Sequence, residues 1–156
     1  MALQVGDLAP DFTAFVRPNE PVSLRDFAGQ PVVLLFFPLA FSSVCTQEIC
    51  GVAEDYGIYE RLGAQVLGIS VDSPYVNQKF AEACHAPFPV LSDFNREATA
   101  AYGVLRDELN GLRGVSERAA FVVGRDGRIA YSWVSADPEL LPRFREIQQA
   151  LRRVDG

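Results

Sequence analysis

The chain has 156 residues, of which 49 % are apolar and 22 % are charged, values typical of a globular domain rather than of a disordered chain. The net charge of −6 argues against a nucleic-acid partner, because nucleic-acid binding needs a basic surface, and against charge-driven docking on an anionic membrane. The longest apolar run, 31–41, is much shorter than the roughly 20 residues that span a bilayer. The chain opens with no basic region followed by an apolar stretch, so we expect a cytoplasmic protein.

The first predicted elements are β-strands. Residues 5–24 form a short β region that prolines interrupt, and 32–37 is a continuous apolar run between two prolines, as expected of a buried central strand. A helix should follow with Ser42 or Ser43 as its N-cap, because apolar residues then recur at helical spacing over 49–59.

The rest of the chain continues this alternation. The predicted elements are a strand at 65–71, a helix at 74–83, a strand at 90–91, a helix at 95–102, strands at 119–123 and 128–134 around an Asp126–Gly127 turn, and a helix at 138–152. This order predicts an α/β, thioredoxin-like fold in one domain over residues 1–156. Its centre should be a mixed β-sheet with helices on both faces.

Cys45 is distinctive because it lies in the first turn of the predicted helix, directly after a buried strand. The N-terminus of a helix presents unpaired amide N–H groups and a positive partial charge, and both favour a thiolate. The same amides can stabilise negative charge that develops on a substrate oxygen. A cysteine that only packs at the start of a helix is the alternative interpretation.

The residues around Cys45 favour the reactive interpretation. Pro38, Ser42 and Cys45 match the signature Pro-x-x-x-Thr/Ser-x-x-Cys, and the chain resembles the peroxiredoxin family. Segments similar to that family follow one another along nearly the whole chain, at 6–12, 33–38, 45–48, 68–72, 88–93, 101–104 and 118–123. Residues 38–41 resemble the alkyl hydroperoxide reductase E branch of the family. The position of Cys50, five residues after Cys45, is instead similar to the bacterioferritin comigratory protein branch.

The resemblance implies a thiol-dependent peroxidase that reduces hydrogen peroxide and organic hydroperoxides and needs neither a cofactor nor a metal. Cys45 would attack the terminal oxygen of the hydroperoxide and become a sulfenic acid. Ser42 would hydrogen-bond the peroxide, and Pro38 would shield the thiolate from water. Arg118 would stabilise the thiolate and the polarised O–O bond, and Glu48 would hold Arg118 in place.

A second thiol must then resolve the sulfenic acid, and Cys50, Cys84 and an external thiol are three alternatives. Cys50 follows Cys45 by five residues, which is a rise of about 7.5 Å in an intact helix. A disulfide usually needs Cα atoms within about 7 Å, so this pairing requires local unwinding. Cys84 ends the next predicted helix and would also have to move. We expect an intramolecular disulfide, which thioredoxin, glutaredoxin or a low-molecular-weight thiol would reduce. The branch resemblance implies a homodimer through the edge near the active site, and a monomer is the alternative.

Three other functions fit parts of the pattern. A thioredoxin-type disulfide reductase shares the fold, but its usual Cys-x-x-Cys motif is shorter than the spacing between Cys45 and Cys50. A metal site made of Cys45, Cys50, Cys84 and His85 has suitable ligand types, but the first two would lie about 140° apart around a helix. A non-catalytic interaction module is disfavoured because the peroxidase signature is intact.

Overall fold

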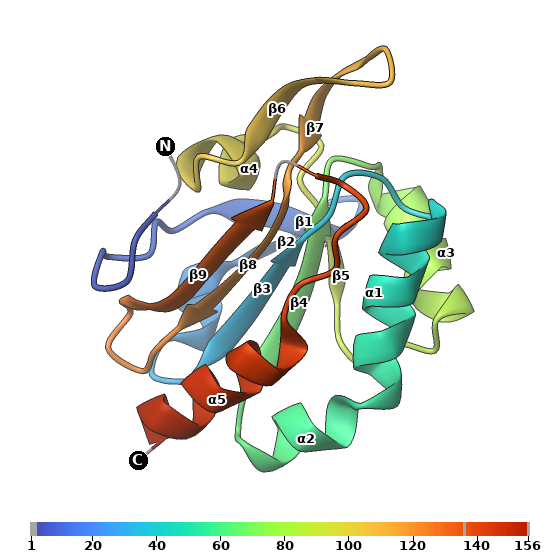
Figure 1. The fold of residues 1–156 in the computed structure, drawn as a ribbon. Helices are drawn as coiled ribbons and strands as arrows, with labels where there is room; N and C mark the ends of the chain where they lie inside the picture. The colour runs from blue at the N-terminus through green and yellow to red at the C-terminus, as the bar shows by residue number, and fades with distance from the viewer. Residues whose placement is uncertain (1–2, 136, 156) are drawn as a thin grey trace.

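A computed structural model describes residues 3–135 and 137–155, and these form a central mixed sheet with helices around it (Figure 1). The sheet has seven strands in the order β2-β1-β5-β4-β3-β8-β9. Their bounds are β1 (Thr13–Arg17), β2 (Glu20–Ser23), β3 (Val32–Phe36), β4 (Gln65–Ser70), β5 (Val90–Ser92), β8 (Arg118–Val123) and β9 (Ile129–Ser135). The helices are η1 (Leu24–Phe27), α1 (Ser43–Glu54), α2 (Tyr56–Arg61), α3 (Pro74–Ala83), α4 (Glu97–Ala101) and α5 (Phe144–Asp155).

Strand β3 lies inside the sheet and explains the continuous apolar run. It pairs in parallel with β4 and antiparallel with β8, and Leu34 lies opposite both Leu67 and Phe121. All five of its residues are buried. Because side chains alternate along a strand, Val33 and Leu35 join the core under α1, α2, α3 and α5, whereas the other β3 side chains join a second core under α4 and η1. The predicted helix-covered mixed sheet is therefore confirmed.

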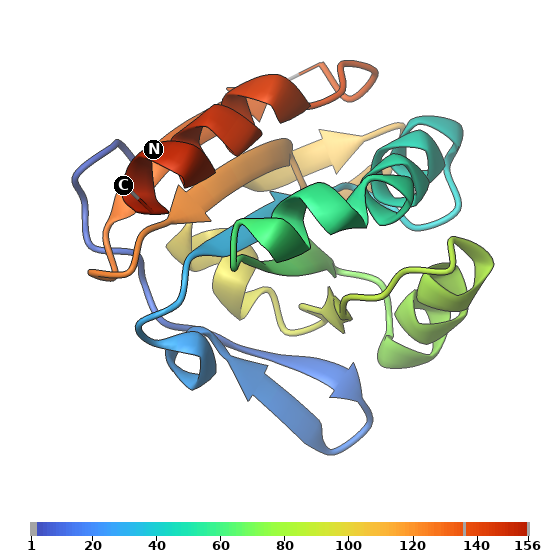
Figure 2. The ribbon, with the colours of Figure 1, turned by 90° about the horizontal axis from the view of Figure 1, so that it is seen from below.

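Helices α2 and α5 lie side by side on one face of the sheet in both views (Figures 1 and 2). Gln148 of α5 donates a hydrogen bond to the Tyr59 hydroxyl of α2, with 3.4 Å between the two atoms. No helix in the described parts of the chain is long and apolar enough to cross a membrane.

The predicted helix after β3 is two helices, because the chain leaves helical geometry at Asp55 between α1 and α2. Asp55 has φ −96° and ψ 13°. Aspartate and the nearby Gly57 are poor helix formers, so this is the weakest point of the apolar pattern. The apolar positions on both sides still face the same core.

The structure differs from the predicted elements at two further places. A hairpin of β6 (Leu105–Leu109) and β7 (Leu112–Ser116) was not predicted, and it projects from the body of the molecule (Figure 1). The last helix begins at Phe144 instead of Pro138, after an irregular stretch at 137–143. Pro142 supplies no amide hydrogen and disfavours helical geometry in the residue before it, which explains the late start.

Candidate active site

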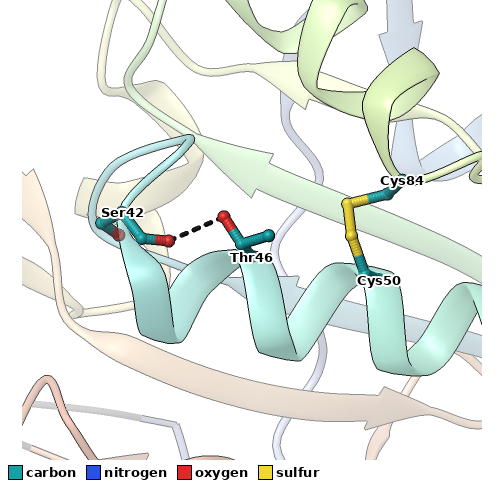
Figure 3. The surroundings of a disulfide bond; sticks show 4 residues. All are labelled: Ser42, Thr46, Cys50 and Cys84. Atoms are coloured by element: carbon teal, nitrogen blue, oxygen red, sulfur yellow. Dashed lines mark hydrogen bonds between the residues drawn. A yellow bond between two sulfur atoms is a disulfide. The ribbon is translucent and has the colours of Figure 1, made fainter.

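The loop between β3 and α1 positions Cys45. Ser42 is the N-cap residue of α1, so Cys45 falls in the first helical turn, as predicted, and its side chain is fully buried. The Ser42 hydroxyl makes no capping bond and instead donates to the Leu39 carbonyl oxygen at 2.8 Å. The backbone carbonyl of Ser42 accepts from the Thr46 hydroxyl at 2.8 Å (Figure 3). Ser42 is therefore the N-cap residue, as predicted, but its hydroxyl bonds back into the loop instead of capping the helix.

Asp72, in the connection between β4 and α3, and Phe80 of α3 hold the same loop. The Asp72 carboxylate accepts from the Ala40 amide and from the Ser70 hydroxyl, each at 2.7 Å. Phe41 has a φ of 68°, an uncommon backbone conformation for a bulky side chain, and its ring packs on Phe80 with 5.1 Å between centroids. These contacts fix the path of the chain directly before the helix that carries Cys45.

Arg118, the first residue of β8, meets Cys45 and Glu48 from across the sheet. One terminal nitrogen, Nη2, lies 3.3 Å from the Cys45 Sγ atom, and the other, Nη1, donates to Glu48 Oε1 at 2.6 Å. Arg118 is 2 % exposed and Glu48 is 0 % exposed. The structure thus brings together three of the residues predicted for the site.

The segment before α5 supplies a further contact that the sequence did not reveal. The Pro138 carbonyl oxygen accepts from Arg118 Nε at 2.9 Å and from Nη2 at 2.6 Å. The guanidinium group is therefore held by a carboxylate on one side and a backbone carbonyl on another. A backbone acceptor has no side-chain signature, so no pattern in the sequence pointed to Pro138 in this role.

The buried charges of this cluster affect one another. Burial raises the pKa of Glu48 to about 7, although the neighbouring Arg118 favours the carboxylate. Burial lowers the pKa of Arg118, but Glu48 and Cys45 outweigh this effect and raise it overall, so the guanidinium stays charged. Within the described residues, Glu48 Oε2 has no hydrogen-bond partner. Burial therefore favours the neutral form of Glu48, and Arg118 opposes this effect by stabilising the carboxylate.

A pocket of about 230 Å³ opens beside this cluster. Pro38, Ser42 and Arg118 line it, whereas the fully buried Cys45 does not. Leu109 and Asn110, at the tip of the β6–β7 hairpin, form part of its wall. No apolar pattern in the sequence predicts a role for these two residues, although the Asn110–Gly111 turn is a signal for the hairpin that presents them.

Cys50 and Cys84 are bonded to each other, and Cys45 is a free cysteine. Their Cα atoms are 4.6 Å apart, and the bond links α1 to the residue that caps the end of α3 (Figure 3). The structure therefore contains neither of the two internal disulfides expected from Cys45. Within the described ranges, no three histidine, cysteine or acidic side chains form a group suited to a metal, and the alternative site that included His85 is not assembled.

Comparisons with known proteins agree with this geometry. Residues 5–132 match the AhpC/TSA family. Peroxiredoxin Bcp of Escherichia coli is 33 % identical over 131 residues, covering 83 % of this chain and 84 % of that protein. Peroxiredoxin-2 of Mus musculus is 33 % identical over 163 residues, covering 98 % and 78 %. The crystal structure of peroxidoxin BcpB from Mycobacterium tuberculosis superposes with a TM-score of 0.85 at 28 % identity, covering 97 % of both chains.

Proposed function

Because the chain belongs to the AhpC/TSA family and is a peroxiredoxin, an antioxidant thiol peroxidase, we propose that Cys45 is the nucleophile that reduces hydroperoxides. The observation that carries the proposal is the 3.3 Å contact between Arg118 Nη2 and Cys45 Sγ in the first turn of α1. A guanidinium group and a helix N-terminus both stabilise a thiolate at this position. The thiolate is the form of cysteine that attacks peroxides.

In the proposed reaction, the Cys45 thiolate attacks the terminal oxygen of ROOH. A sulfur–oxygen bond forms, the O–O bond breaks, and the alkoxide leaves and takes up a proton to give ROH. Cys45 is oxidised to a sulfenic acid and the peroxide is reduced. Arg118 stabilises the negative charge as it moves from sulfur to the leaving oxygen, and the contacts with Glu48 and Pro138 keep the guanidinium in place during this step.

Ser42 and Pro38 are proposed to orient and protect the reacting atoms. The Ser42 hydroxyl donates to Leu39 and so retains lone pairs that can accept a hydrogen bond from the peroxide O–H group. Pro38 is buried at the wall of the pocket, where its ring limits the access of water to the thiolate. The lining combines polar groups with the apolar side chains of Leu39, Val44 and Leu109, a mixture that suits hydrogen peroxide and small organic hydroperoxides alike.

We further propose that an internal thiol resolves the Cys45 sulfenic acid. Cys50 lies on the same helix, and Cys84 lies at the end of the neighbouring helix α3, so both are supplied by this chain. The resulting disulfide would be reduced by thioredoxin, glutaredoxin or a low-molecular-weight thiol.

The proposed reaction is tested with fully reduced protein from which the reductant has been removed. Wild-type protein should consume one equivalent of hydrogen peroxide or cumene hydroperoxide rapidly, and dimedone should label Cys45 at early times. Cys45→Ser should lose the fast reaction with both peroxides while its circular dichroism spectrum stays that of the wild type. A folded Cys45→Ser protein that consumes peroxide at the wild-type rate would refute the proposal.

A further inference from the structure

We propose that the Cys50–Cys84 disulfide is the end product of the peroxidase cycle, formed by a relay that passes oxidation from Cys45 to Cys50 and then to Cys84. The structure holds this pair oxidised while Cys45 is a thiol, which is the distribution that a completed relay leaves behind. The inference rests on the proposed function, because the relay starts from the Cys45 sulfenic acid.

Burial separates the site of peroxide reduction from the place where a reductant can act. Cys45 is 0 % exposed and contacts Arg118, which lines the pocket proposed to bind the peroxide. Cys50 is partly exposed, and the Cys50–Cys84 bond lines a separate surface pocket of about 250 Å³ with Ala53, Glu54, Ala83 and His85. A dithiol can approach the bond from this pocket while the contacts around Cys45 stay closed. Peroxide reduction and disulfide reduction therefore take place at two different surface pockets.

In the first relay step, the Cys50 thiolate attacks the sulfur of the Cys45 sulfenic acid. The Cys45–Cys50 bond forms, the S–O bond breaks, and the hydroxide takes up a proton and leaves as water. Cys50 attacks first in this scheme because it shares α1 with Cys45, so unwinding one helix is enough to bring the sulfurs together. The residue after Cys50 is Gly51, which lowers the stability of this part of the helix.

In the second step, the Cys84 thiolate attacks the Cys50 sulfur of that bond. The Cys50–Cys84 bond forms, and Cys45 leaves as a thiolate, so two sulfurs remain oxidised and no other reactant is needed. Arg118 is placed to stabilise the departing thiolate. An external dithiol then reduces the Cys50–Cys84 bond by exchange and becomes a disulfide itself.

The geometry of α1 favours transfer of the disulfide from Cys45–Cys50 to Cys50–Cys84 over the reverse reaction. A Cys45–Cys50 bond is incompatible with an intact helix, because five residues rise about 7.5 Å. The Cys50–Cys84 bond, in contrast, coexists with a continuous α1 from Ser43 to Glu54. Transfer of the bond to Cys84 therefore lets α1 refold and returns Cys45 to the first turn beside Arg118.

The test is a quenched time course on fully reduced protein that receives one equivalent of hydrogen peroxide without oxygen. Free thiols are alkylated at each time point, and the disulfides are mapped by mass spectrometry. In the wild type, a transient Cys45–Cys50 bond should precede Cys50–Cys84, and Cys45 should end as an alkylated thiol. Cys84→Ser should accumulate the Cys45–Cys50 bond. Cys45→Ser should form Cys50–Cys84 at least about tenfold more slowly, because its remaining thiols lack the activated site.

The relay is overturned if wild-type protein ends with Cys45 in a disulfide, or if Cys45→Ser forms the Cys50–Cys84 bond as fast as the wild type. In both cases, rapid oxidation of Cys45 in the wild type would leave the peroxidase proposal standing. A Cys45 that never reacts with peroxide would instead refute the proposed function itself. Should Cys84→Ser fail to fold, the wild-type time course tests the relay by itself. A Cys45–Cys50 bond that forms before the Cys50–Cys84 bond supports the relay, and the reverse order refutes it.

Discussion

Arg118 contacts Cys45, Glu48 and the Pro138 carbonyl at once, so its effect depends on the shape of the guanidinium group as well as on its charge. Arg118→Lys keeps the charge but lacks the fork that reaches several partners. We expect the rate constant for Cys45 oxidation by hydrogen peroxide to fall by about 10²-fold, the range seen when one preorganised donor is lost. Rapid-quench alkylation followed by mass spectrometry measures this rate.

The matched control for this substitution is Arg143→Lys. Arg143 is exposed and pairs with Glu146 on the surface, and such pairs contribute little to stability. Its rate should equal that of the wild type. An Arg118→Lys protein that reacts as fast as Arg143→Lys would show that charge alone is sufficient at this position.

Glu48 should give the stability of the protein a distinctive pH dependence. Burial raises its pKa from the ordinary value of 4.5, which applies to the unfolded chain, to about 7 in the folded protein. Between these two pH values the folded state therefore binds more protons than the unfolded state. The contribution of Glu48 to the free energy of unfolding is therefore largest below pH 4.5 and is lost as the pH rises through about 7. Glu48→Gln, which does not titrate, should remove this decline.

Urea denaturation of both proteins at several pH values between 4.5 and 7 measures the effect. The informative quantity is the difference in unfolding free energy between Glu48→Gln and the wild type, because the other titrating groups contribute equally to both. A difference that stays constant over this range would contradict the prediction.

At the level of single residues, the sequence predicted the part of the site that side chains carry. Cys45, Glu48 and Arg118 were assigned by resemblance, and they meet in the structure. The carbonyl of Pro138 and the bond from Ser42 to Leu39 were not predicted, because both depend on the backbone path. The contact between Cys50 and Cys84 depends on how α1 and α3 are placed side by side, which local spacing does not encode.

On the scale of the elements, the β6–β7 hairpin depends on Gly114, a glycine that no sequence pattern distinguishes. Gly114 of β7 has a φ of 77°, and a Cβ atom there would lie 2.7 Å from Arg96 Nε. That same nitrogen donates to the Gly114 carbonyl oxygen. Gly114→Ala should therefore lower the free energy of unfolding by about 1–2 kcal/mol, because it combines an unfavourable backbone conformation with a steric clash.

Chemical denaturation of the oxidised protein tests this substitution, and Gly51→Ala is the matched control. Gly51 lies within α1, and a Cβ atom there meets nothing within 4 Å. Alanine in a helix interior is favoured over glycine by about 1 kcal/mol, so the control should be at least as stable as the wild type. Equal stability of the two variants would contradict the special role of Gly114.

The elements that were predicted are those with long, regular apolar patterns. The buried β3, the helix α3 and the β8–β9 hairpin all appear close to their predicted positions. Strands β6 and β7 have mostly exposed side chains at their outer ends, so they lack the alternation that reveals a half-buried strand. The break at Asp55 was hidden because the apolar residues of α1 and α2 face one core across it.

On the scale of the whole molecule, the order of elements was enough to predict the fold class but not the strand order. Parallel pairing of β3 with β4 follows from a helical connection between consecutive strands. The insertion of β5 between β1 and β4 joins segments far apart in the chain, and only long-range packing selects it. The core that α1 and α3 share on one face of this sheet brings these two helices close enough for their cysteines to bond.

The Cys50–Cys84 bond should make the stability of the whole protein depend on its redox state. The two cysteines are separated by 34 residues in the sequence, and closing a loop of this size restricts the unfolded chain. The chain-entropy relation predicts that reduction lowers the free energy of unfolding by up to about 4 kcal/mol. Urea denaturation of oxidised and reduced protein under argon measures the difference.

A double variant, Cys50→Ser with Cys84→Ser, separates this effect from other consequences of reduction. It retains Cys45 but cannot form the bond, so its unfolding midpoint should not respond to reductant. If the relay forms this bond, adding peroxide to reduced wild-type protein should raise its unfolding midpoint to the value of the oxidised protein. The unfolding midpoint of Cys45→Ser should rise far more slowly. Equal midpoints for oxidised and reduced wild-type protein would mean that the bond does not restrict unfolding, and stability would then not report on the redox cycle.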